Sequence, residues 1–308
     1  MAPAKTKTTG GKGLLFKREN AWNRVPPAEH RRIEAYCAEY LRFLSAAKTE
    51  RQAFELAVAL AGKAGFQDLE TGSAAVRPGA RVYRGCRGKT LVLAHIGRRP
   101  LTDGLHIVGG HTDAPRLDAK PCPLYQEGDM ALLDTRYYGG IKKYQWVATP
   151  LALHGVVVKE NGERVKIEIG EDPADPVFVI TDLLPHLGKD QAQKKLEDHI
   201  SGEGLNVIVV NVSVSTADDD RDVKDKIKLN VLRLLERRYG IREEDLTSAE
   251  LELVPAGPAR ELGLDRSMLL GYAHDDRVCA YAALRALLDL RSTPEYTAVA
   301  VLCDKEEI

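Results

Sequence analysis

Two short apolar segments, far apart in the chain, each end in side chains that can bind a metal. Residues 105–110 (LHIVGG) precede His111, and residues 297–303 (TAVAVLC) precede the sequence DKEE at 304–307. Short apolar runs bounded by turn residues indicate strands that are buried in a mostly parallel sheet. In open sheets of this kind, ligands bind beyond the carboxyl ends of the strands. The sequence therefore predicts an α/β fold in which these two strand ends meet and form a site.

The order of helix and strand patterns predicts three parts. Residues 1–121 and 256–308 alternate between helical and strand patterns, whereas 122–255 is rich in strand-forming residues separated by Gly, Asn and Asp. We expect the outer parts to form one α/β domain, with a mostly parallel sheet flanked by helices. The middle part is then an inserted β-rich domain. Residues 1–13, rich in Lys, Thr and Gly, predict a disordered tail.

Apolar residues at spacings of three and four predict helices at 27–47, 222–238 and 278–290. Thr49 and Gln52 fit a capping box, which predicts a further helix that begins there. The remaining predicted elements are strands, at 90–96, 105–108, 130–133, 146–159, 165–169, 177–180, 205–212, 251–254 and 297–303.

Composition excludes several classes of partner. The chain has 308 residues, of which 44% are hydrophobic and 29% are charged, and its formal net charge is -1. A nearly neutral chain gives no electrostatic basis for binding nucleic acid or an anionic membrane surface. The five cysteines are widely spaced without a C-x-x-C pair, which favours a reducing compartment such as the cytoplasm. We expect small molecules or peptides as partners.

His111 and Asp113 are candidates for a metal ligand and its support. A neutral imidazole suits Zn²⁺ or Mn²⁺. A carboxylate two residues later can accept a hydrogen bond from the other ring nitrogen and so orient the ring. A single His-x-Asp sequence is also common as a structural histidine, so this motif alone does not decide between the two.

Asp275 and Asp276 stand just before a predicted helix. Aspartate at a helix N-terminus is commonly a cap, with Arg277 as a surface partner. In the alternative interpretation, Asp275 bridges two metals about 3.5 to 4 Å apart and Asp276 supports it.

Glu306 and Glu307 follow the last predicted strand. Acidic pairs are common in exposed loops. Successive residues of a strand point to opposite sides, however, so one carboxylate could bind a metal while the other accepts the proton of the attacking water.

Taken together, these segments resemble the aminopeptidase I and aspartyl aminopeptidase family of dinuclear zinc metallopeptidases. The resemblance rests on GHTDAP at 110–115, the Asp275 and Asp276 pair, and DKEEI at 304–308. It extends to FKRENAW at 16–22 and SAELEL at 248–253. The fold that it implies is of the zinc exopeptidase type, interrupted by an inserted β-rich dimerisation domain.

The resemblance also implies a role for each residue of the site. His111 would bind one metal, Asp275 would bridge both, and Glu307 would bind the second. Glu306 would be the general base, and Asp113 would orient His111. The cofactor would be two divalent metal ions, with zinc as the first choice and cobalt or manganese as alternatives.

The resemblance implies a dodecamer built from dimers. In aspartyl aminopeptidases, a histidine from the inserted domain of the neighbouring subunit reaches the active site. His186 is the nearest counterpart in this chain, although a structural loop histidine fits its surroundings equally well. The substrates that the resemblance implies are short peptides.

Family members continue well beyond the glutamate pair, and that part holds a further Asp and His ligand. This chain has three of the five protein ligands that the resemblance implies. We therefore expect it to lack the C-terminal part of the catalytic domain and to hold no complete dinuclear site by itself.

The leading hypothesis is a metal-dependent aminopeptidase. A deacylase or other amide hydrolase with the same dinuclear site is an alternative, and a non-catalytic assembly subunit or fragment without metal is another.

Overall fold

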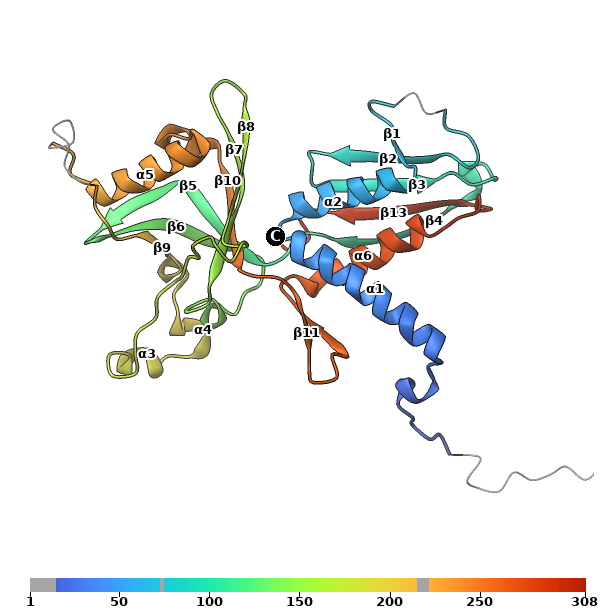
Figure 1. The fold of residues 1–308 in the computed structure, drawn as a ribbon, viewed down its shortest axis with the longest axis horizontal. Helices are drawn as coiled ribbons and strands as arrows, with labels where there is room; N and C mark the ends of the chain where they lie inside the picture. The colour runs from blue at the N-terminus through green and yellow to red at the C-terminus, as the bar shows by residue number, and fades with distance from the viewer. Residues whose placement is uncertain (1–14, 73–74, 215–221) are drawn as a thin grey trace, which may run out of the picture. The chain divides into compact units, whose positions relative to one another are not determined.

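The structure is a computed structural model that describes residues 15–72, 75–214 and 222–308 (Figure 1). The predicted tail at 1–13 lies outside the described residues. The chain divides into two compact units, residues 1–40 and 41–308. The first contains η2 (Ala21–Arg24) and most of α1 (Pro27–Ala46). All other elements belong to the second unit.

Five strands form the first sheet of the second unit. Their spatial order is β1 (Gln67–Asp68), β2 (Arg81–Cys86), β3 (Thr90–His95), β13 (Thr297–Cys303) and β4 (Leu105–His111). β13 runs parallel to β4 and antiparallel to β3, β2 is antiparallel to β3, and β1 is parallel to β2. The α/β class is confirmed, and the strand directions are mixed. β2 and β3 form a hairpin across a tight turn, and strands joined by such a turn must be antiparallel.

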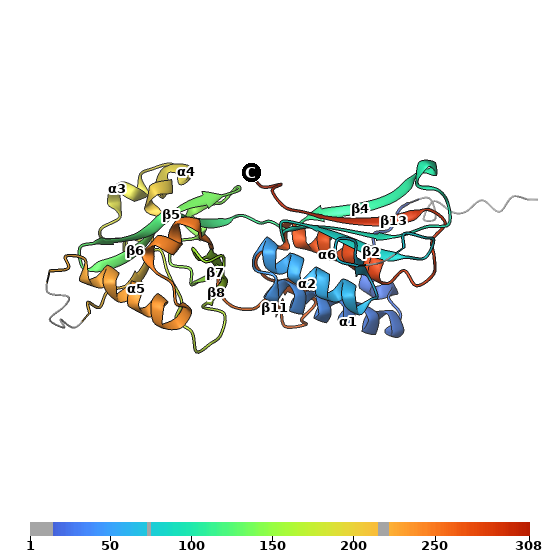
Figure 2. The ribbon, with the colours of Figure 1, turned by 90° about the horizontal axis from the view of Figure 1, so that it is seen from above.

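Two helices cover one face of this sheet, α2 (Glu50–Lys63) and α6 (His274–Leu288) (Figure 2). The capping box predicted for α2 is confirmed, because Thr49 Oγ1 accepts the N–H of Gln52 at 3.2 Å and Gln52 Oε1 accepts the N–H of Thr49 at 3.1 Å. The core between helices and sheet includes Ala57, Leu93 and Leu284, which are fully buried. Burial of the apolar faces of α2, α6 and the sheet stabilises this arrangement and so positions the ends of β4 and β13.

Six strands form the second sheet, and all its pairings are antiparallel. Their spatial order is β8 (Arg164–Ile169), β7 (Leu151–Val158), β10 (Glu250–Pro255), β5 (Arg116–Glu127), β6 (Met130–Tyr138) and β9 (Val207–Val210). The predicted strand at 177–180 forms isolated bridges only, at Phe178, Val179 and Ile180.

β5 was not predicted, because Pro121 and Pro123 interrupt its sequence and proline cannot donate to a strand ladder. A register shift between Ala119 and Leu124, with Cys122 at φ 52°, accommodates them. β5 begins at Arg116, upstream of the predicted domain boundary at residue 122. The boundaries at 122 and 255 stay predictions.

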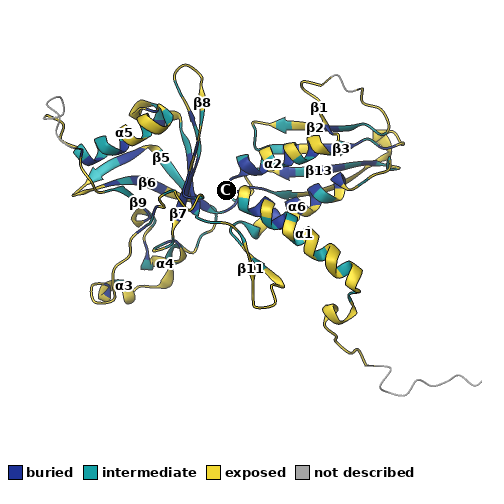
Figure 3. Ribbon diagram, in the orientation of Figure 1, coloured by how far each residue is buried: buried dark blue, intermediate teal, exposed yellow. Residues whose placement is uncertain are grey.

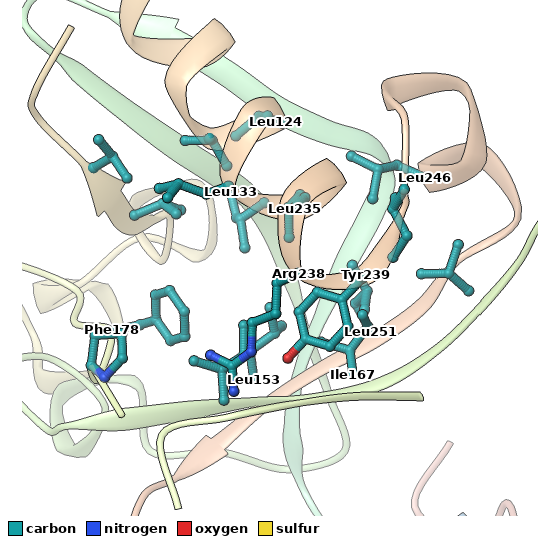
Figure 4. A pocket seen from close by; sticks show the side chains of 18 of the residues that line it. Leu124, Leu133, Leu153, Ile167, Phe178, Leu235, Arg238, Tyr239, Leu246 and Leu251 are labelled. Atoms are coloured by element: carbon teal, nitrogen blue, oxygen red, sulfur yellow. The ribbon is translucent and has the colours of Figure 1, made fainter. Parts of the chain in front are cut away.

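Helix α5 (Lys226–Tyr239) packs against the second sheet, with Ile227 and Val231 in the shared core. Figure 3 shows the burial of the residues along this helix. A cavity of about 450 Å³ lies between them, lined mostly by apolar side chains such as Leu153, Ile167 and Leu235 (Figure 4). At its rim, Arg238 pairs with Asp175 at 3.2 Å. The cavity is apolar and contains none of the candidate catalytic residues.

The remaining elements are short. They are η3 (Leu101–Asp103), η4 (Lys143–Gln145), α3 (Lys189–Ala192), α4 (Leu196–His199), η5 (Gly202–Gly204), η7 (Glu243–Ser248), and the hairpin of β11 (Arg260–Leu262) and β12 (Met268–Leu270). Among the described residues, no helix has both the length and the apolar character needed to cross a membrane.

Candidate metal centre

Parallel pairing of β4 and β13 brings the two predicted strand ends together. His111 is the register partner of Cys303, and the N–H of Thr112 donates to the Cys303 carbonyl at 2.8 Å. The residues after each strand therefore emerge side by side. Ligand atoms of His111, Glu306 and Glu307 all lie within 4.8 Å of one another.

The two ring nitrogens of His111 have different surroundings. Nδ1 lies 3.0 Å from the main-chain carbonyl of Asp113, to which it can donate. Nε2 lies 3.4 Å from Asp275 Oδ1 and 3.7 Å from Glu306 Oε2. Burial lowers the pKa of His111, but the Asp113 carbonyl and nearby carboxylates outweigh this effect and raise it. Nε2 is thus the nitrogen that faces Asp275 and Glu306.

The Asp113 side chain is fully buried. Its Oδ1 lies 3.5 Å from His111 Nδ1, farther than the main-chain carbonyl of the same residue at 3.0 Å. Its carboxylate accepts the Tyr138 hydroxyl at 2.6 Å and the main-chain N–H groups of Glu306 at 3.3 Å and Glu307 at 3.1 Å. Burial raises the pKa of Asp113, but these three donors outweigh burial and lower the pKa below its usual range. A charged Asp113 therefore holds the main chain of the glutamate pair.

Asp275 and Asp276 lie at the start of helix α6 with non-helical dihedral angles, φ -87°, ψ 112° and φ -112°, ψ 28°, so the regular helix begins only after this pair. Asp276 Oδ2 accepts the N–H of His111 at 3.4 Å, so it contacts the end of β4. The side chain of Asp275 is 87% exposed, which leaves it accessible to a ligand.

Arg277 is not a surface partner of these aspartates, because it is 1% exposed. Its Nη2 donates to the carbonyls of Thr112 at 3.0 Å and Lys48 at 3.1 Å. Arg277 therefore holds the loop after β4 through a buried hydrogen bond to the Thr112 carbonyl.

His186 is exposed in the segment between Leu184 and Gly188. The group of ligand atoms found among the described residues at this site consists of His111, Glu306 and Glu307 and does not contain it. A role for His186 across a subunit interface stays a prediction.

The sequence profile described as "Aminopeptidase I zinc metalloprotease (M18)" matches residues 43–308. The chain belongs to this family. A probable M18 family aminopeptidase 1 of Borrelia garinii is 43% identical over 294 residues, which are 95% of this chain and 63% of that protein. The crystal structure of an M18 aminopeptidase from Thermotoga maritima matches with a TM-score of 0.87 and 42% identity, over 96% of this chain and 62% of that one.

A solved structure of lower sequence identity shares the fold. A yeast mApe1 dodecamer matches with a TM-score of 0.65 at 19% identity, over 88% of this chain and 60% of that chain. The chain spans about 63% of the length of the curated M18 relatives it matches.

Three features of this candidate site were not predicted from the sequence. They are the contact of Tyr138 with Asp113, the buried position of Arg277 under the loop after β4, and the approach of Gly139 to Glu307. Tyr138 and Gly139 are distant in sequence from the motifs. The pair of adjacent glycines after a strand was the available signal, because it indicates a close approach of the backbone to another group.

We predict that Gly139→Ala weakens metal binding about tenfold. Gly139 has φ 72°, and a Cβ there would lie 2.9 Å from Glu307 Oε2 and 3.3 Å from the Cα of Pro115. The Glu307 carboxylate would have to move. Gly162→Ala is the matched control, since Gly162 has φ 82° and no atom within 4 Å of its added Cβ. Both variants carry the backbone strain, so a zinc titration that shows equal losses for both would contradict the prediction.

Proposed function

We propose that the protein is a metal-dependent aminopeptidase that removes N-terminal residues from short peptides. The observation that carries the proposal is the convergence of His111, Glu306 and Glu307 within 4.8 Å, in a chain of the M18 family. His111, Asp275 and Glu307 are the proposed metal ligands, and Glu306 is the proposed general base.

The donor set fits divalent zinc. It combines one imidazole nitrogen with carboxylate oxygens, and Nδ1 of His111 is already engaged with Asp113, so that Nε2 is left for a metal. When bound, divalent ions would polarise the peptide carbonyl and lower the pKa of the attacking water. We propose two ions, with zinc favoured over cobalt or manganese.

The protein residues supply positioning and proton transfer. Glu306 is 63% exposed at its side chain, whereas the neighbouring Asp113 is buried and accepts the Glu306 N–H. An exposed carboxylate on a main chain that is held in place can take a proton from water and deliver it to the leaving amine. Burial raises the pKa of Glu307 above its ordinary value, and the opposing effect of His111 is smaller.

An open depression beside Glu307 is the proposed peptide-binding surface. It has a volume of about 520 Å³ and includes Arg136 and Lys305.

We also propose that the protein assembles into a dodecamer built from dimers through its β-rich insertion, with His186 reaching a neighbouring site. The yeast relative of this fold is a dodecamer, which supports the proposal. All five cysteines are free, which supports a reducing cytoplasmic location.

The test uses the natural gene product loaded with zinc. Peptides with a free N-terminus and the same peptides with an acetylated N-terminus are compared for release of the first residue. We expect turnover of the free peptides only. Turnover of the acetylated peptides alone would support a deacylase or related amide hydrolase. Near-zero metal content after dialysis, without turnover of either peptide, would support a non-catalytic subunit.

A further inference from the structure

Tyr138 links the second sheet to the candidate metal centre. It is the last residue of β6, and its hydroxyl donates to Asp113 Oδ2 at 2.6 Å, the shortest of the three hydrogen bonds that this carboxylate accepts. A phenol is protonated at neutral pH, so it acts as the donor in this pair. Hydrogen bonds to a charged acceptor are stronger than neutral ones, and this one is buried.

The tyrosine ring is itself held in place. The Arg116 guanidinium lies over the ring at 4.0 Å from its centroid, and Lys305 Nζ lies at 4.9 Å. Arg116 is 3% exposed and is fixed by Asp118 at 2.7 Å. The ring of Tyr138 therefore has little freedom, and its hydroxyl is pre-organised toward Asp113.

Asp113 connects Tyr138 to the proposed general base and metal ligands through hydrogen bonds. Its two carboxylate oxygens accept the main-chain N–H groups of Glu306 and Glu307, while its own carbonyl accepts from His111 Nδ1. If the carboxylate rotates, both glutamates lose a main-chain anchor. Removing a residue that supports metal ligands in this way usually lowers metal affinity or activity by about 10- to 100-fold.

We propose that Tyr138 is a positioning residue for the metal centre: it fixes the Asp113 carboxylate, and thereby Glu306 and Glu307, from the second sheet. The inference rests on the proposed function. It means that the β-rich insertion contributes to the site within its own chain, besides any part it has in assembly.

The test compares Tyr138→Phe with Tyr125→Phe in the natural gene product. Phenylalanine keeps the ring on which Arg116 stacks and removes only the donor. Tyr125 is the matched control, because it lies in β5 of the same sheet and its hydroxyl accepts a 2.8 Å hydrogen bond from Asn206, away from the site. Zinc affinity is measured by competition with a chelator, and kcat and KM are measured with a free peptide.

Tyr138→Phe is expected to weaken zinc binding and lower kcat by about tenfold each, with KM changed less than about twofold. Tyr125→Phe is expected to change neither. In a double-mutant cycle, Tyr138→Phe should have less than about a twofold further effect on zinc affinity when Asp113 is already asparagine.

Three results would overturn the inference. They are wild-type zinc affinity in Tyr138→Phe, an equal loss in Tyr125→Phe, or independent effects of Tyr138→Phe and Asp113→Asn. If the wild type binds zinc but releases no N-terminal residue, the proposed function fails while the zinc measurements still decide the role of Tyr138. A wild type that binds no zinc overturns both.

Discussion

Glu306→Gln is expected to lower kcat for release of an N-terminal residue by about 10²- to 10⁴-fold, with little change in KM. Glutamine keeps the size of the side chain and cannot accept a proton from water. Because the Glu306 N–H donates to Asp113 from the main chain, the substitution leaves that anchor in place. The measurement is steady-state turnover of a free peptide by the zinc-loaded natural gene product.

Glu295→Gln is the matched control for this substitution. Glu295 is also an exposed glutamate of the second unit, and it pairs with Arg99 at 2.9 Å without contacting the site. We expect its turnover to equal that of the wild type. Turnover of Glu306→Gln within about threefold of the wild type would exclude Glu306 as the general base.

Glu50→Gln is expected to reduce the free energy of unfolding by about 3 kcal/mol at pH 7. Glu50 is 0% exposed, and its carboxylate pairs with Lys89 at 2.8 Å and Arg116 at 3.4 Å. Removing the negative charge leaves two cations less compensated in the interior.

The effect of Glu50→Gln should depend on pH. Burial raises the pKa of Glu50, but Arg116 and Lys89 outweigh it and lower the pKa to about 2 from the ordinary 4.5. A carboxylate with a depressed pKa stabilises the fold fully above its ordinary pKa, and this contribution is lost as the pH falls toward the folded value. The difference between wild type and variant should therefore be constant from pH 7 to about 5 and shrink below about 4.5.

Urea unfolding at several pH values measures this difference. Glu70→Gln is the control, since Glu70 makes an exposed ion pair with Arg84 at 3.3 Å and should change stability by less than about 1 kcal/mol. A loss below about 1 kcal/mol in Glu50→Gln at pH 7, or a difference that grows in acid, would contradict the prediction.

Local patterns predicted the elements of this chain well where the pattern depends on near neighbours. The capping box at Thr49 needs only residues three apart, and β13 is a continuous apolar run, so both were found. β5 was missed because its two prolines break the strand pattern, and only the partner strands β6 and β10 determine how the bulge is accommodated. The mixed direction of the first sheet likewise depends on β13 pairing with β3, about 200 residues earlier in the sequence.

The candidate site shows the same division. The sequence by itself determined which side chains stand at the ends of β4 and β13, because strand ends can be predicted from local apolar runs and the ligand-type residues follow them directly. Only the tertiary structure decided that Asp113 holds the glutamate main chain, that Tyr138 holds Asp113, and that Arg277 is buried beneath the loop. Each of these contacts joins residues that lie 25 or more positions apart, and their partners are fixed by how sheets and helices pack rather than by local spacing.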